Sequence, residues 1–124
     1  MKLNFYSVSL ASAFICFSLA IAWMFAPQML FALGEIVYTY PAGLVGRRGA
    51  GVFLGIGVMF VLARNTGPSP ARSALAYGFS LACGCLAVLG LYEYFTGHLG
   101  AAIFFAIVVE LVLAVLLLIV AGKK

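Results

Sequence analysis

Long uncharged runs separated by short polar segments dominate the pattern of this chain. Four runs are expected to form helices, at about residues 5–26, 44–63, 73–92 and 99–122. A stretch of about 20 apolar residues crosses the hydrocarbon core of a bilayer as a helix. Charged residues stand near the ends of these runs and form no polar helix face, which argues against a soluble helical protein. The pattern predicts an all-α polytopic membrane protein, a single four-transmembrane-helix bundle over residues 1–124.

Composition agrees with this class. Hydrophobic residues make up 66% of the 124 residues and charged residues only 8%, against about 25% charged in soluble domains. Alternating segments of about ten residues, typical of a membrane β-barrel, are absent. The net charge of +4 is explained by membrane topology and does not indicate a nucleic-acid partner. We therefore expect membrane lipid as a partner, and no cofactor.

The positions of lysine and arginine predict the orientation. Five of the seven lie at the end of the bundle that holds both termini: Lys2, Arg64, Arg72, Lys123 and Lys124. Arg47 and Arg48 lie at the opposite end. Because cytoplasmic loops carry the excess of these residues, we expect both termini in the cytoplasm.

The connection between the first two spans is expected to lie outside the membrane, at residues 27–43. Pro27 suits the first position of a helix and Gly34 the position after its end, so residues 28–33 are expected to form a short interfacial helix. Residues 36–40 then look extended. This segment is expected to cap the bundle. The tight turn at residues 96–98 makes the last two spans antiparallel neighbours.

Glu110 is the one charged residue inside the last run. A carboxylate at mid-membrane costs several kcal/mol unless it is protonated, paired or in contact with water. We expect Glu110 to be buried and mainly protonated at neutral pH. Two interpretations stay open. In the first, Glu110 binds a small ligand or relays protons in an internal cavity. In the second, it is a structural acid that hydrogen-bonds a carbonyl or a neighbouring protomer.

Small residues predict which helices pack. At a rise of 1.5 Å per residue, four residues fall near the membrane midplane: Cys16, Gly55, Cys83 and Glu110. Gly51 and Gly55 share a face of the second span, while Ala106 and Ala114 lie one turn either side of Glu110. Small residues let membrane helices approach closely. We therefore expect the second and fourth spans to pack against each other through the two glycines, Gly51 and Gly55, and the two alanines, Ala106 and Ala114.

Further candidate ligand- or proton-binding residues lie toward the opposite end. Arg47 and Arg48 are expected to reach the lipid headgroups with their long side chains. Alternatively, one of them turns inward to pair with Glu35 or Glu93, or to hold an anionic ligand. His98, the only histidine, is either a solvated turn residue or a pH-sensitive contact.

The three cysteines are not expected to bind metal. Cys83 and Cys85 point about 200° apart on a helix, so they cannot chelate together. A soft-metal layer of Cys16 and Cys83 near Glu110 is the less favoured alternative to three small hydrophobic residues. The sequence has no Ser-His-Asp set and no phosphate-binding glycine loop, so no catalytic residue is predicted.

Several motifs resemble a bacterial family of small four-helix integral membrane proteins of unknown function and, more loosely, DoxX-like proteins. They are Pro27 after the first span, Arg47-Arg48-Gly49-Ala50-Gly51 and Gly55-Ile56-Gly57 in the second, and Glu110-Leu111-Val112-Leu113-Ala114 in the last. The resemblance covers nearly the whole chain. It implies the four-helix fold and a bacterial inner membrane location, and it implies no activity.

Two functional hypotheses follow. The first is a non-enzymatic membrane protein, a homo-oligomer or an accessory subunit of a membrane complex, with a polar intramembrane site around Glu110. The alternative is a small membrane enzyme or carrier that acts on a lipid-like molecule beneath residues 27–43. The absence of a paired acid and base favours the first hypothesis.

Overall fold

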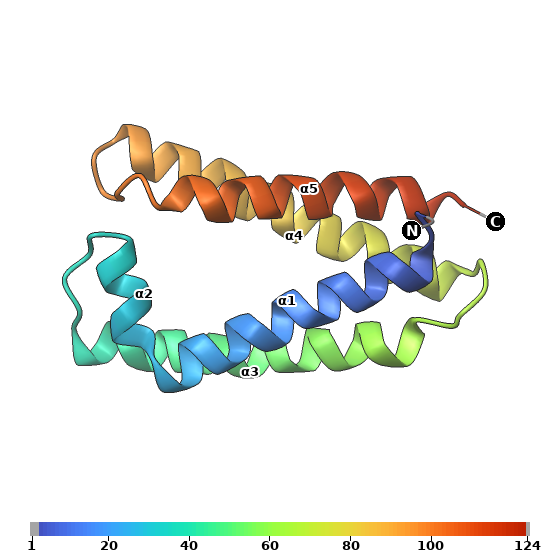
Figure 1. Ribbon diagram of the computed structural model, residues 1–124, viewed down its shortest axis with the longest axis horizontal. Coiled ribbons are helices and arrows are strands. Elements are labelled where there is room, and N and C mark those ends of the chain that lie inside the picture. The colour runs from blue at the N-terminus through green and yellow to red at the C-terminus, as the bar shows by residue number, and fades with distance from the viewer. Residues whose placement is uncertain (1–2, 124) are drawn as a thin grey trace.

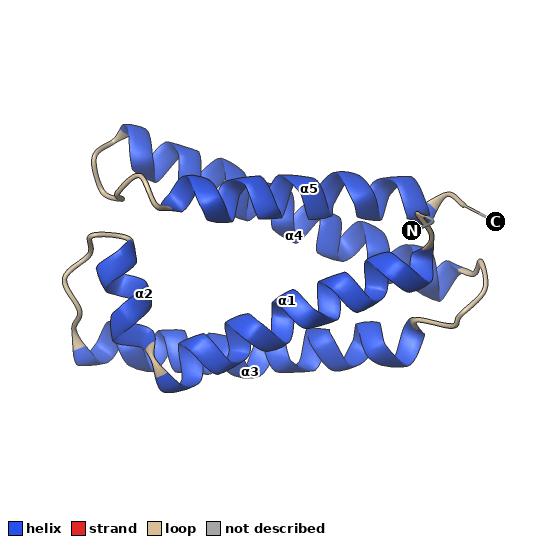
Figure 2. Ribbon diagram, viewed as in Figure 1, coloured by secondary structure: helices blue, strands red, loops and turns tan. Residues whose placement is uncertain are grey.

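The computed structural model describes residues 3–123, and in this part of the chain it contains five helices (Figures 1 and 2). They are α1 (Phe5–Phe25), α2 (Pro27–Leu33), α3 (Tyr40–Ala63), α4 (Pro70–Phe95) and α5 (Ile103–Ala121). All except α2 are long and apolar enough to span a membrane. The predicted four-span helical bundle is therefore confirmed, and the chain is a multi-pass membrane protein.

Polar caps determine where two of the spans begin. The Thr39 hydroxyl accepts a hydrogen bond of 3.3 Å from the N–H of Ala42, and α3 begins at Tyr40, one turn before the expected residue 44. Ser69 caps α4 in the same way, and this helix begins at Pro70, three residues before the expected start. A side-chain oxygen at this position satisfies a backbone N–H that has no partner within the helix. Both spans are therefore longer than the uncharged runs alone indicate.

The short helix expected at residues 28–33 is present as α2, with proline at its start. Residues 36–39 have no regular structure and lead into α3. A series of edge contacts between aromatic rings holds this external segment against α1. The Trp23 ring makes an edge contact with Phe31, which makes another with Tyr38, each with 5.7 Å between ring centroids. The aromatic contacts fix the segment as a folded cap.

The four spans form two pairs. α1 packs chiefly on α3, and α4 on α5. Figure 1 shows that the pairs approach each other at the end where the described chain begins and finishes, called here the terminal end. They diverge toward the opposite end, called here the α2 end, where α2 stands between them. Lys2 and Lys124, which entered the charge count, lie outside the described residues.

A hydrophobic cluster joins the two pairs at the terminal end. Its buried members come from all four spans: Phe5, Val8, Ala13, Phe60, Ala76, Leu117, Val120 and Ala121. A smaller cluster of Cys83, Leu113 and Ala114 lies nearer the middle of α4 and α5. The main packing between the pairs is therefore concentrated in one half of the bundle.

The expected close contact of α3 with α5 through Gly51 and Gly55 was wrong. Both glycines are exposed, and a Cβ atom added at either would meet nothing within 4 Å. The buried small residues of α3 are Gly43, Ala50 and Gly57, which recur every seven residues and lie on another face of the helix. An added Cβ at Gly57 would lie 2.7 Å from the Phe17 ring of α1. α3 therefore turns its closest-packed face toward α1.

One backbone contact connects the pairs at the α2 end. The N–H of Gly100, in the turn before α5, donates a 3.0 Å hydrogen bond to the carbonyl of Gly34. Glu35 has a left-handed backbone with φ of 57°, and its carboxylate lies directly over Gly100. A Cβ atom at position 100 would overlap this carboxylate, so a larger residue there requires the Glu35 side chain to move. The external segment is thus attached to the α4–α5 turn.

Candidate intramembrane site

Glu110 lies in the middle of α5, and its side chain is half-buried. Its Oε2 atom is shielded from the surroundings and has no hydrogen-bond partner among the described residues. The buried residues Ile107, Ala114 and Leu117 lie three, four and seven positions away, which places them on the same helix face. One carboxyl oxygen is therefore inside the bundle with its hydrogen-bonding capacity unused.

Cys83 of α4 is a neighbour of this carboxyl group, and Cys16 of α1 is in turn a neighbour of Cys83. Both thiols are free and buried. No three His, Cys, Asp or Glu side chains within residues 3–123 are grouped closely enough to hold a metal ion. The contact with the Glu110 carboxyl therefore comes from α4, through Cys83.

Two buried hydroxyls of α1 add to the unsatisfied polar groups of the core. Ser9 and Ser12 are fully buried, and neither Oγ atom has a partner in the described part of the chain. A buried polar group without a hydrogen bond costs about 1–3 kcal/mol in proteins. The interior of the bundle therefore contains three unsatisfied oxygen atoms, at Ser9, Ser12 and Glu110.

Ala114 belongs to the contact between α4 and α5. Its carbonyl accepts a 2.8 Å hydrogen bond from the Ser80 hydroxyl across the two helices. Ala106, the other small residue beside Glu110, is half-buried. These alanines lie on the helix that packs on α4, so the close partner of α5 is α4 and not α3.

Replacing Ser80 with alanine is expected to destabilise the α4–α5 pair by about 0.6 kcal/mol, the average measured for a hydrogen bond between membrane helices, and by at most about 1.7 kcal/mol. The free energy of unfolding in detergent measures the effect. Ser18→Ala is the matched control, because the Ser18 hydroxyl bonds the carbonyl of Phe14 within its own helix. Equal losses in the two variants would contradict a role for the interhelical bond.

Arg47 and Arg48 do not pair with a carboxylate among the described residues, where the ion pair found is His98 with Glu93. Arg47 is half-buried, and its guanidinium lies over the Tyr40 ring, 5.4 Å from the centroid. Because Tyr40 is the first residue of α3, the Arg47 side chain extends toward the N-terminal end of this span. Arg48 is exposed. Of the two alternatives, the arrangement fits side chains that reach toward headgroups.

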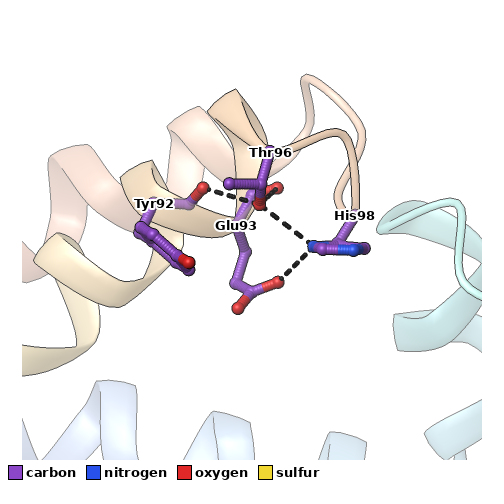
Figure 3. Close-up of polar contacts among 4 residues, drawn as sticks. All are labelled: Tyr92, Glu93, Thr96 and His98. Carbon is purple, nitrogen blue, oxygen red and sulfur yellow. Dashed lines mark hydrogen bonds and ion pairs between the residues drawn. The ribbon is translucent and has the colours of Figure 1, made fainter.

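His98 and Glu93 form a local polar cluster at the α2 end (Figure 3). His98 Nδ1 lies 2.9 Å from Glu93 Oε2 and 3.0 Å from the Thr96 hydroxyl. The same hydroxyl donates to the carbonyl of Tyr92 at 2.9 Å. The cluster joins the last turn of α4 to the loop that follows it and stabilises the α4–α5 turn. The His98 side chain is 69% exposed at this end of the bundle, whereas Glu110 lies in the middle of α5.

Arg72 is a buried charged residue that the sequence analysis did not identify as buried. It is only 7% exposed. Its guanidinium donates to the carbonyls of Val120 at 3.0 Å, Lys123 at 2.8 Å and Thr66 at 3.4 Å, and it lies 4.5 Å from the centroid of the Phe5 ring. A cation in the first turn of a helix is disfavoured by the helix dipole. The unfavourable position of a cation at the start of α4 was the one indication in the sequence that the Arg72 side chain contacts groups outside its own helix.

No protein-family model, curated protein or solved structure matches this chain. The resemblance to small bacterial four-helix membrane proteins therefore stays a prediction. The geometry around Glu110 carries the functional conclusion.

Proposed function

We propose that this is a non-enzymatic integral membrane protein whose bundle holds a protonatable site at Glu110, where it binds a proton or a small ligand. The observation behind this proposal is the buried, unpartnered Oε2 atom in the middle of a span. A charged carboxylate there costs several kcal/mol. A bound proton removes the charge, and a ligand that donates a hydrogen bond to Oε2 satisfies the remaining acceptor.

The cellular setting is part of the same proposal. The excess of lysine and arginine at the terminal end supports cytoplasmic termini, and the resemblance supports a bacterial inner membrane. We also propose that the protein forms a homo-oligomer or joins a larger membrane complex. Gly51 and Gly55 are exposed on α3, and small residues four apart favour close approach of a second membrane helix.

Glu110→Gln is expected to abolish labelling by a hydrophobic carbodiimide, a reagent that modifies protonated carboxyl groups within membranes. The wild-type protein in membranes is expected to carry the label on the peptide that contains residue 110. Mass spectrometry of the digested protein locates it. The fold is expected to survive, because an amide replaces a neutral acid as both donor and acceptor.

Glu93→Gln is the matched control, since it removes one carboxyl from the α2 end and is expected to leave the label in place. A ligand bound at Oε2 is expected to protect Glu110, so removal of small molecules by extensive washing should increase the labelling. Wild-type protein without label at residue 110, at acidic and at neutral pH alike, would refute a protonated site there.

A second candidate function is supported by an apolar pocket of about 310 Å³ in the α1–α3 pair. Its lining contains only hydrophobic residues: Phe17, Ala20, Ile21, Met24, Phe25, Ala50 and Leu54. Such a pocket suits an acyl chain and supports an enzyme or carrier that acts on a lipid-like molecule beneath residues 27–43. This candidate ranks second because the lining offers no acid or base for catalysis.

A further inference from the structure

A basic pocket lies at the terminal end of the bundle, well away from Glu110. Its volume is about 300 Å³. The start of α1, the α3–α4 loop and the end of α5 meet there. The polar residues of its lining are Asn4, Arg64, Asn65, Thr66, Arg72 and Lys123. Because these segments begin or end spans, the pocket sits at the level of the membrane boundary.

The charge of this pocket is not balanced by any side chain within residues 3–123. The sequence has only three carboxylate side chains, Glu35, Glu93 and Glu110. Glu35 and Glu93 belong to the α2 end, and Glu110 precedes Lys123 by 13 residues, roughly 20 Å along a helix. None of the three pocket cations forms an ion pair among the described residues. The described side chains therefore leave room for an anion from outside the protein.

Arg72 contributes a buried cation to the pocket. Its three carbonyl partners hold the guanidinium in place but supply no negative charge, and its buried Nε has no hydrogen-bond partner in residues 3–123. A buried cation without a counter-ion is unfavourable. An anion bound in the pocket offsets this cost through its charge, while the three carbonyl bonds keep the guanidinium in place.

The other two cations are also positioned by backbone carbonyls. Arg64 donates to the carbonyl of Val61, and Lys123 Nζ donates to the carbonyl of Leu3 at 2.7 Å. Asn4 uses Oδ1 to accept the N–H of Ser7 at 2.9 Å, which leaves its amide nitrogen as a donor. The N-terminal ends of α1 and α4 lie at the same end of the bundle (Figure 1), and helix N-termini attract anions.

We propose that this pocket binds a phosphate group, presented by the headgroup of an anionic phospholipid. Guanidinium groups bind phosphate through paired hydrogen bonds, and the site lies at the depth where lipid phosphates are found. Basic residues at a membrane boundary attract anionic lipid. A second source of the same chemistry is free phosphate, which the experiment distinguishes.

The test titrates the detergent-solubilised protein with phosphatidylglycerol and with phosphatidylcholine, and counts bound lipid by native mass spectrometry. Phosphatidylglycerol is expected to bind more tightly. The double variant Arg64→Gln, Lys123→Gln is expected to bind it about thirtyfold more weakly, since each basic residue contributes about 1 kcal/mol at an anionic lipid surface. Arg72 is left intact because it also holds the end of α5.

The matched control is Arg47→Gln, Arg48→Gln, which removes the same charge from the opposite end and is expected to weaken the binding much less than the pocket variant does. A second variant, Arg64→Lys, Lys123→Arg, keeps the charge and is expected to keep the binding. Equal binding of the two lipids, or equal losses in the two glutamine variants, would overturn the proposal. Inorganic phosphate that displaces phosphatidylglycerol at equal concentration would overturn the lipid as the source.

Discussion

Phe60→Ala is expected to lower the free energy of unfolding by about 3 kcal/mol, the lower end of the range for such substitutions. Phe60 is fully buried in the cluster that joins the two helix pairs. Its ring makes an edge contact with Phe79 of α4 at 5.1 Å between centroids. Lipid is as apolar as phenylalanine, so transfer from lipid contributes little. The loss comes from the packing and the cavity.

Leu62→Ala is the matched control, because Leu62 lies two residues away on α3 and is 76% exposed. This substitution is expected to leave the free energy of unfolding nearly unchanged, since the side chain at position 62 contacts lipid or detergent in the folded and in the unfolded state. Unfolding in mixed micelles, followed by circular dichroism, measures both free energies. Similar losses in the two variants would contradict a joint between the pairs at Phe60.

Gly57→Leu is expected to destabilise the protein by about 2 kcal/mol, within the usual range for overpacked sites. Even the first carbon of the new side chain would lie 2.7 Å from the Phe17 ring. The ring must move, and α1 must separate from α3. Thermal unfolding in detergent is the measurement, with the position of Trp23 fluorescence as a second probe of the α1–α3 pair.

Gly55→Leu is the control on the same helix, since nothing lies within 4 Å of a Cβ added there. It is expected to leave the unfolding temperature of the monomer unchanged and to weaken self-association, because the exposed glycine face is the proposed contact with a second copy. If Gly55→Leu destabilises the monomer more than Gly57→Leu does, the assigned inner face of α3 is wrong.

The spans could be predicted from the sequence because lipid permits so few structures. Backbone groups have no water to bond within the membrane, so a long apolar run becomes a helix. The short helix after Pro27 was also predictable, since proline at its start and Gly34 at its end are local signals. These features depend on neighbouring residues only.

The inner face of α3 could not be predicted in the same way. In a soluble protein the buried face is the apolar one, but lipid is as apolar as a protein interior. Gly51 and Gly55 therefore look the same in sequence as Gly43 and Gly57. Choosing between them requires the shape of the partner helix, here the Phe17 ring, and that information is distant in the chain.

The candidate site residues also differ in whether their contacts depend on neighbouring residues or on residues far away in the chain. The contact of Glu93 with His98 spans a single turn, yet no sequence pattern favours it over a pair with Arg47 or Arg48. Arg72 reaches carbonyls 48 and 51 residues later, and no local pattern encodes such a contact. The depth of Glu110 was readable from helix length, but the unused oxygen atom was not.

Pairwise packing also sets an order for biosynthesis. Each span contacts chiefly a partner from its own half of the chain, α3 with α1 and α5 with α4, so the first hairpin can assemble while the second is still being translated. Membrane helices insert first and associate afterwards. The cluster around Phe60 needs Leu117 and Val120 from the last turns of α5. A nascent chain therefore lacks the packing that joins its two helix pairs until the last turns of α5 have left the ribosome.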